Sequence, residues 1–397
     1  MSPLALLLAA AGGAVAAAIV AELVARKLLR AYGGYYRYRP HSRERLEIDQ
    51  TALPSLDPVS KVSINRDGER GGEPPPKGEP VWRALVIGGS AAECYYLDQH
   101  QTWPAVLERL LSEPAALATL GAPRVHIGNV AKAILPCEQI TLLLSRVLPR
   151  YAELDAIFVM VGASDVIRWM EKKTPAKITE GAFALSSVFE QHPEGPFGFS
   201  PKKTALWHLA SRVNQWLRRP EAVRKNTGDW LHRTRKMRAN AETLLTELPD
   251  PTPMLDHFEK YYREMIRLAK SKARRVIVVR QPWFDKDHSP EEKALLWNFG
   301  MGRPYIEEVK VYADIKAAYA LLKKVDDRAA AINDELGVEQ LDLMPILERS
   351  ARVYYDTLHF TPAGAEDVAE AVRKLVLAGA KEGQAKPAAA RKERAAG

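Results

Sequence analysis

Short apolar runs alternate with amphipathic stretches between residues 82 and 378. The apolar runs lie at residues 84–87, 125–127, 156–161, 275–279 and 341–343. Between and after them, apolar residues recur with helical spacing at residues 103–111, 138–148, 256–270, 310–335 and 362–378. Continuous apolar strands that alternate with amphipathic helices are typical of a parallel sheet covered on both faces. The pattern therefore predicts an α/β fold within a body of residues 81–378.

Residues 170–255 interrupt this alternation and predict a helical insertion in the body. Apolar residues gather on one side of a helix over residues 206–217, and His208, Arg212, Arg218 and Arg219 lie opposite. One interpretation is a helix packed on the body with a solvated basic face. The other is a cap over a functional site, or a surface that meets acidic glycan or lipid headgroups.

The N-terminal segment, residues 1–25, predicts a single-pass transmembrane anchor. Residues 1–21 carry no charged side chain, close to the roughly 20 residues that cross a bilayer as a helix. No basic residue precedes the segment, which disfavours a cleaved signal, although Ala-Val-Ala at residues 14–16 could be cleaved. Basic residues follow it, at Arg26, Lys27, Arg30, Arg37 and Arg39. Their placement predicts a body on the cytoplasmic side, with the periplasmic or extracellular side as the alternative.

The segments on either side of the body have simpler compositions. Residues 26–80 are basic and then rich in proline, which predicts an extended juxtamembrane linker with a short strand at residues 62–65. Its tyrosines are expected in the headgroup layer of the membrane, at Tyr32, Tyr35, Tyr36 and Tyr38. Residues 379–397 consist mostly of small and charged residues and predict a disordered tail.

Charge and cysteine content exclude several classes of protein. The net charge of +8 comes from residues 26–45, residues 201–240 and the tail, and the rest of the chain is net negative. A nucleic-acid-binding protein more often spreads its basic residues over the folded surface, so we expect no nucleic-acid partner. The two cysteines, Cys94 and Cys137, cannot build a disulfide scaffold or a C-x-x-C zinc site. No phosphate-loop, dinucleotide or zinc-protease motif occurs, and no metal or organic cofactor is implied.

Polar residues follow the ends of several predicted strands. Ser90 follows the first, Ser164 the third, and Asp356 and His359 come after the fifth. In a parallel sheet, functional groups gather at the carboxyl edge. A nucleophilic serine needs a histidine base, which in turn needs an orienting carboxylate. These residues are therefore candidates for a catalytic site. Taken singly, each motif is also compatible with a turn, a buried histidine or a helix cap.

The order of these motifs resembles that of the SGNH (GDSL-type) serine hydrolases. Gly88-Gly89-Ser90 resembles the nucleophile block of that family, and Asp356-Thr357-Leu358-His359 resembles its C-terminal block. The resemblance covers about residues 62–378. It implies a flavodoxin-like three-layer sandwich, with Ser90 as nucleophile, His359 as base and Asp356 as its orienting partner.

Two middle blocks depart from the family pattern at the expected oxyanion hole. Ile134 stands where members have a glycine whose backbone N–H contacts the oxyanion, and Ser164 replaces an asparagine donor. The resemblance therefore makes Ser90, Ile134 and Ser164 the candidate oxyanion-hole residues. A β-branched residue restricts the backbone, and a serine side chain is shorter than that of asparagine. Loss of one oxyanion donor costs roughly 10²–10³-fold in turnover.

These features together predict a membrane-anchored serine esterase that hydrolyses a small acyl ester through an acyl-enzyme. The resemblance implies O-acetyl groups on a glycan as the substrate class. If an alcohol replaced water, the same residues would make an O-acyltransferase of an envelope assembly. The other alternative is an inactive SGNH-fold protein that serves as a binding or scaffold module.

Overall fold

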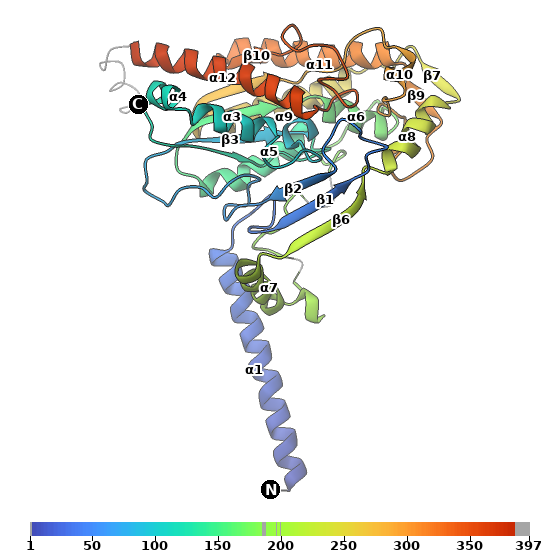
Figure 1. Ribbon diagram of the computed structural model, residues 1–397. Coiled ribbons are helices and arrows are strands. Elements are labelled where there is room, and N and C mark those ends of the chain that lie inside the picture. Colours follow the sequence, from blue (N-terminus) through green and yellow to red (C-terminus); the bar gives the residue numbers. More distant parts are fainter. Residues whose placement is uncertain (1, 185–187, 196, 199, 386–397) are drawn as a thin grey trace.

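The computed structural model describes residues 2–184, 188–195, 197–198 and 200–385, which fold around a five-stranded parallel sheet (Figure 1). The strands are β3 (Trp82–Gly88), β4 (Val125–Asn129), β5 (Leu154–Met160), β8 (Ala273–Arg280) and β10 (Glu339–Asp342). Their order across the sheet is β4-β3-β5-β8-β10, and each neighbouring pair is parallel. This is the flavodoxin-like order 2-1-3-4-5. The predicted fold is confirmed.

Helices cover both faces of the sheet. Alternate residues of β3 point to opposite sides, so that Ala84 and Val86 join one core cluster while Leu85 and Ile87 join the other. The first face carries α3 (Trp103–Leu111), α4 (Pro114–Leu120) and α12 (Pro362–Ala385). The second carries α5 (Cys137–Val147) with η1 (Leu148–Arg150), α6 (Ala163–Glu171), α9 (Thr252–Lys270) and α11 (Ile315–Leu336). Because both faces are buried, the strands are apolar at nearly every position.

The last helix extends beyond the predicted end of the body. α12 continues to Ala385, into the segment for which a disordered tail is predicted. Alanine and lysine, which are frequent there, have high helix propensity. Arg275 of β8 also donates hydrogen bonds to the carbonyl oxygens of Leu375 and Val376. The remainder of the predicted tail, residues 386–397, lies outside the described residues.

Much of the segment 26–80 is folded, which differs from the extended linker that its prolines predict. β1 (Arg43–Ile48) and β2 (Val59–Ser63) pair antiparallel, and β6 (Glu221–Thr227) adds a parallel strand on the other side of β1. Leu46 and Leu53 are fully buried. The prolines lie outside these strands, so they mask the strand pattern in the sequence without interrupting the pairing.

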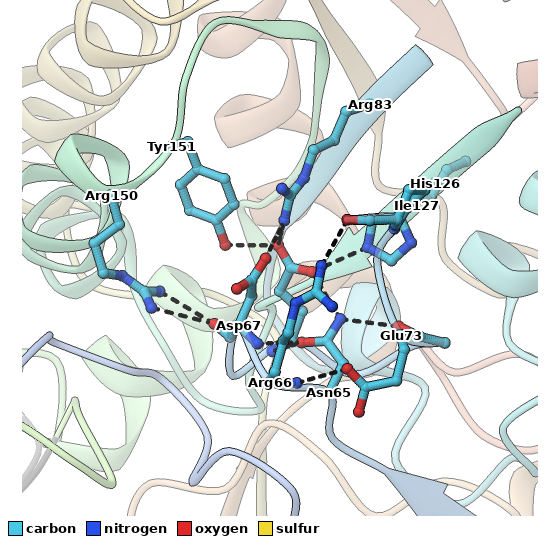
Figure 2. A network of polar contacts seen from close by, with 12 residues as sticks. Asn65, Arg66, Asp67, Glu73, Arg83, His126, Ile127, Arg150 and Tyr151 are labelled. Carbon is cyan, nitrogen blue, oxygen red and sulfur yellow. Dashed lines mark hydrogen bonds and ion pairs between the residues drawn. The ribbon is translucent and has the colours of Figure 1, made fainter. Parts of the chain in front are cut away.

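A buried ionic network joins this N-terminal segment to the central sheet. Figure 2 shows Arg83 of β3, His126 of β4 and Tyr151 converging on the loop of residues 65–73. The carboxylate of Glu69 in this loop accepts hydrogen bonds from Arg83 Nη2 at 3.1 Å and from the Tyr151 hydroxyl at 2.7 Å. His126 Nε2 lies 3.1 Å from the same carboxylate. These contacts fix the N-terminal segment against the edge of the sheet.

The Glu69 carboxylate stays ionised although it is fully buried. Burial alone would raise its pKa, but the hydrogen bond and charge of His126, together with the charge of Arg83, outweigh burial and hold the pKa at about 2. Gly128 of β4 makes the close approach feasible, because a Cβ there would lie 2.3 Å from the Glu69 carboxylate carbon.

The insertion, residues 170–255, contains strands as well as helices. The predicted helix at residues 206–217 is confirmed as α7 (Ala205–Arg218), and it follows η2 (Pro201–Lys203). α8 (Trp230–Ala239) comes after β6, and β7 (Thr243–Leu245) pairs in parallel with β9 (Val311–Ala313). The residues of β6 are mostly charged or polar and largely exposed, so no apolar period marks this strand in the sequence. Short helices α2 (Ser90–Glu93) and α10 (Pro290–Lys293) follow β3 and β8.

The N-terminal helix α1 (Pro3–Tyr32) extends away from the body as a single rod (Figure 1). By length and composition this helix is apolar enough to cross a membrane, and none of its most apolar stretch of 18 residues is buried. Residues 3–25 of the predicted anchor are therefore the first part of a longer helix, which ends at Tyr32. Near the end of this helix, Ala25 and Leu29 are buried against α7.

Candidate active site

Ser90 lies at the carboxyl end of β3 and is the first residue of α2. Gly88 ends the strand with φ +155°, and a Cβ there would lie 2.1 Å from the carbonyl oxygen of Met160 in β5. Gly89 donates its N–H to that same oxygen at 3.1 Å. A Cβ on Gly89 would lie 2.7 Å from Ser164 Oγ. The two glycines thus allow a tight turn against β5 that presents Ser90 at the edge of the sheet.

The structure brings Ser90, His359 and Asp356 together in one hydrogen-bonded series. His359 Nε2 lies 2.7 Å from Ser90 Oγ. On the other side of the ring, His359 Nδ1 lies 2.8 Å from each carboxylate oxygen of Asp356. Ser90 is 269 positions from His359 in the chain, and the two meet because the loop before α12 lies beside the end of β3. A serine, an imidazole and a carboxylate in this order can activate the serine hydroxyl.

Asp356 is held in its ionised form by several donors. It is buried and accepts hydrogen bonds from the backbone N–H groups of Leu358 at 2.9 Å and His359 at 3.0 Å, and from the Trp297 indole N–H at 2.9 Å. Burial alone would raise its pKa, but the charge of His359 and these hydrogen bonds hold the pKa below its ordinary value. The Tyr355 ring stacks on the His359 ring with centroids 5.5 Å apart. The imidazole is therefore held by the stacked Tyr355 ring on one face and by the Asp356 carboxylate at Nδ1.

Ile134, in the loop after β4, lines the same cavity as Ser90. Its φ is +66°, in the left-handed region that β-branched residues rarely adopt. Its backbone N–H has no acceptor in the part of the chain that the structure describes. The loop thus keeps a backbone conformation that favours glycine, while the side chain is that of isoleucine.

Ser164 also lines this cavity, from the first turn of α6. The next residue, Asp165, is buried and accepts the N–H of Cys137 at the start of α5, at 3.1 Å. Burial raises the pKa of Asp165 to about 7. The three candidate oxyanion-hole residues, Ser90, Ile134 and Ser164, therefore line one cavity, and Asp165 joins α6, which carries Ser164, to the end of the loop that carries Ile134.

No sequence motif points to Glu93, which holds the Ile134 loop in place. This buried carboxylate accepts a hydrogen bond from Ala133 N–H at 2.6 Å and from Lys132 Nζ at 2.8 Å. The Tyr38 hydroxyl lies within hydrogen-bond distance of both Glu93 and the carbonyl oxygen of Ala131. Tyr38 is thus buried beside the site, not exposed at headgroup level as its place in the tyrosine-rich segment predicts.

The cavity around Ser90 has a volume of about 470 Å³, and its surface is mainly apolar. The aromatic residues that line it are Tyr95, Tyr96, Trp230, Trp297, Tyr305 and Tyr355. Trp230, from α8 of the insertion, packs edge-to-face on Trp297 at 4.8 Å and donates its indole N–H to the Tyr96 hydroxyl. The second half of the insertion therefore forms one wall of the site. The cap that is one interpretation of the helix at residues 206–217 is not found there, because α7 contributes no lining residue to this cavity, whereas α8 does.

The described residues contain no group of three or more His, Cys, Asp or Glu side chains arranged to hold a metal ion. Cys94 and Cys137 are buried free thiols. Burial raises the pKa of Cys94 to about 12, so it is a neutral thiol at physiological pH.

The chain matches no protein-family profile and no curated protein. Similar solved structures include a lipolytic protein of the G-D-S-L family from Veillonella parvula, at 10% identity, TM-score 0.39, and coverage of 74% of this chain and 96% of that chain. Another is Axe2, an acetylxylan esterase from Geobacillus stearothermophilus, at 12% identity, TM-score 0.39, and coverage of 75% and 93%. The first belongs to the family that the sequence motifs resemble. Likeness at this level says nothing about the substrate of the present chain.

Proposed function

We propose that this protein is a serine esterase that hydrolyses a small acyl ester, with Ser90 as nucleophile, His359 as general base and Asp356 as orienting carboxylate. The observation that carries the proposal is the short hydrogen-bonded series from Ser90 Oγ through His359 to Asp356. The position of Ser90 at the carboxyl edge of a parallel sheet, inside a cavity, supports it further.

The reaction follows from this arrangement. His359 Nε2 takes the proton of Ser90 Oγ as that oxygen attacks the ester carbonyl, and returns it to the departing alcohol when the ester C–O bond breaks. A water molecule then attacks the acyl-serine, losing its proton to His359, and the carboxylic acid leaves as Ser90 is regenerated. The ionised Asp356 accepts the Nδ1 hydrogen bond and stabilises the imidazolium formed in each half-reaction.

The oxyanion of each tetrahedral intermediate needs donors that face the cavity. The N–H of Ser90, at the first position of a helix, lacks an intrahelical acceptor. We assign the other two donors to Ile134 N–H and the Ser164 hydroxyl, which line the same space. The strained Ile134 backbone and the short Ser164 side chain make this hole the part of the site that limits turnover.

The walls of the cavity fit a short acyl group on an alcohol with a flat apolar face. The β-branched Ile134 side chain occupies space beside Ser90, and the aromatic rings offer broad apolar surfaces. O-acetyl groups of a glycan, the class implied by the sequence resemblance, meet both conditions. The same mainly apolar enclosure would favour a second alcohol over water as acceptor, which is the observation in favour of acyl transfer. With α1 as a single-pass anchor, the reaction takes place next to a membrane.

The proposal is tested with the full-length chain purified in dodecyl maltoside. We expect a fluorophosphonate probe to label the parent protein and the Ser145→Ala variant, a matched change at an exposed serine of α5, but not Ser90→Ala. Hydrolysis of p-nitrophenyl acetate should follow the same pattern. Equal labelling of the Ser90→Ala variant would overturn the assignment of the nucleophile. No labelling of the folded parent protein would favour a non-catalytic binding module.

A further inference from the structure

A second cavity lies where α1 meets the body, on the side of α7 that faces the N-terminal segment. Its volume is about 700 Å³. The polar side chains that line it include Arg39, His41, Arg66, His208, Arg212 and Gln215. Five of its lining residues, including His208 and Arg212, lie on successive turns of α7, so this cavity is built from one side of that helix together with the chain that follows α1.

Three arginines and one glutamate line the cavity, and the Glu73 carboxylate lies 3.6 Å from Nδ1 of the lining residue His41. None of Arg39, Arg66 and Arg212 forms a salt bridge with a carboxylate in the described ranges. The acidic lining residue is Glu190, whose carboxylate is engaged by the backbone N–H of Arg39 at 3.1 Å. Burial lowers the pKa of Arg212, and the charge of nearby Arg39 lowers it further. Like charges held together in a partly buried space are stabilised by a bound anion.

The position of α7 places this cavity at the end of the apolar helix. Glu22 of α1 accepts the first backbone N–H groups of α7, from Ala205 at 2.8 Å and from Leu206 at 3.1 Å. Its carboxylate also pairs with Arg26, one turn farther along α1. In α1 the apolar residues give way to basic ones at this point. If α1 crosses a bilayer, the cavity lies at the depth of the lipid headgroups.

An apolar stripe on α7 lies beside the cavity and is open to solvent. Leu206, Val213 and Leu217 follow one another at positions i, i+7 and i+11 and are 41%, 55% and 65% exposed. Trp216, which borders the cavity, is 58% exposed. An amphipathic helix with exposed leucine and tryptophan next to basic residues is typical of a helix that lies in the membrane interface.

We propose that this cavity binds the phosphate headgroup of an anionic phospholipid, whose acyl chains lie along α1 and the apolar stripe of α7. The guanidinium groups of Arg39 and Arg212 match the geometry of a phosphate, since each can donate two parallel hydrogen bonds. The apolar stripe of α7 shields the acyl chains of the same lipid molecule from water. The proposal uses α1 as a membrane helix but does not depend on esterase activity.

The test measures thermal unfolding of the full-length chain in dodecyl maltoside, with added dioleoyl phosphatidylglycerol, dioleoyl phosphatidylcholine or inorganic phosphate. We expect phosphatidylglycerol to raise the Tm by about 5 °C at roughly 100 times its Kd, because a ligand bound to the folded state alone stabilises that state. Phosphatidylcholine and phosphate should have much smaller effects. Arg212→Gln and Arg39→Gln should each lose most of the shift. Arg218→Gln, on the same helix but outside the cavity lining, should keep it.

Each outcome decides the proposal. Equal shifts with phosphatidylcholine, or a full shift in both cavity variants, would overturn it. An equal shift with inorganic phosphate alone would overturn the lipid assignment and leave a site for a free anion. If Arg212→Gln does not fold, Arg39→Gln decides, since Arg39 is exposed. Native mass spectrometry of the same samples should show a bound phosphatidylglycerol that Arg218→Gln retains and Arg39→Gln loses.

Discussion

Ile134 has a backbone conformation that is unfavourable for its β-branched side chain. A β-branched residue at φ +66° costs about 1–3 kcal/mol. The conformation persists because Glu93 holds the neighbouring N–H of Ala133 and Asp165 holds Cys137 at the far end of the loop. The strain is thus imposed by two buried carboxylates on either side of the residue.

Ile134→Gly should therefore raise both stability and turnover. Glycine adopts this backbone without strain, so we expect about 1 kcal/mol of added unfolding free energy. Combined with Ser164→Asn, which supplies a longer donor, kcat for p-nitrophenyl acetate should rise roughly tenfold or more. Ile134→Val is the matched control, because it keeps the branch and the strain. Urea unfolding and steady-state kinetics test both effects, and no gain in the double variant would mean that these residues do not face the oxyanion.

At the residue scale, the candidate triad could be predicted and its supports could not. Ser90, Asp356 and His359 stand in short motifs next to strand ends, where local sequence carries a signal. Glu93 and Trp297 act only through contacts with distant residues: the Trp297 hydrogen bond to Asp356 spans 59 positions. A lone glutamate or tryptophan in a sequence does not reveal such a partner.

At the scale of elements, α8 and the loop before β9 support the site from one side. Trp230 of α8 packs on Trp297, whose indole N–H reaches Asp356. Arg235, also from α8, donates hydrogen bonds to the carbonyl oxygens of Tyr355, Leu295 and Ala52. The second half of the insertion, with α8, is therefore part of the candidate site, whereas α7 is not.

We expect Trp297→Phe to lower kcat about tenfold, because Asp356 loses a donor while the aromatic wall is kept. KM should change little, since the ring still lines the cavity. Trp207→Phe, at a half-exposed position of α7, serves as control and should behave like the parent protein. A rise in KM with kcat unchanged would instead make Trp297 a substrate contact.

Outside the central sheet, the short strand predicted at residues 62–65 overlaps β2 (Val59–Ser63), whereas β1 and β6 were missed for a physical reason. The five central strands could be predicted because both of their faces are buried, which makes nearly every position apolar. β1 and β2 lie between prolines and bury one side, and β6 buries almost nothing. The pairing of β1 with β6 joins residues 178 positions apart, as in Arg43 with Glu221, which no local pattern records.

The link between the N-terminal segment and the sheet makes its own prediction, at Glu69. Glu69→Gln should lower the unfolding free energy by about 3 kcal/mol at pH 7.5, because Arg83 loses its buried partner. The folded-state pKa of about 2 is below the 4.5 of a free glutamate. The stabilisation is therefore present above pH 4.5 and is lost as the pH falls from about 4.5 toward 2. In urea unfolding, the difference in unfolding free energy between the parent protein and Glu69→Gln should decrease as the pH falls over that interval.

Glu79→Gln is the control for this measurement. Glu79 pairs with Arg124 at the surface, where both side chains are exposed, so its loss should cost less than about 1 kcal/mol. If the difference in unfolding free energy between the parent protein and Glu69→Gln stayed constant from pH 7.5 to pH 3, packing and not charge would account for the effect of Glu69.

At the scale of the whole molecule, α1 and the basic residues after its apolar part predict a membrane protein with a cytoplasmic body. The protein should stay in the membrane pellet after carbonate extraction. A green fluorescent reporter fused after Gly397 should fluoresce, whereas alkaline phosphatase at the same junction should be inactive. This junction leaves the β1–β2 pair intact. The double variant Lys27→Gln with Arg30→Gln should weaken the preference of the body for the cytoplasmic side. Strong phosphatase activity from the unaltered chain would place the body outside the cytoplasm.

The contact between Glu22 of α1 and the start of α7 restricts the movement of α1 relative to the folded body. Only the chain from Gly33 to Ser42 separates α1 from β1, and it contains the buried Tyr38. Once such a rod is embedded in a bilayer, the mouth of the cavity around Ser90 stays at one height and one tilt above the surface. For the membrane-anchored esterase proposed above, we therefore expect that esters too far from the bilayer, or too close to it, are not hydrolysed whatever their chemistry. Under that proposal, the distance of an ester from the membrane selects substrates independently of their structure.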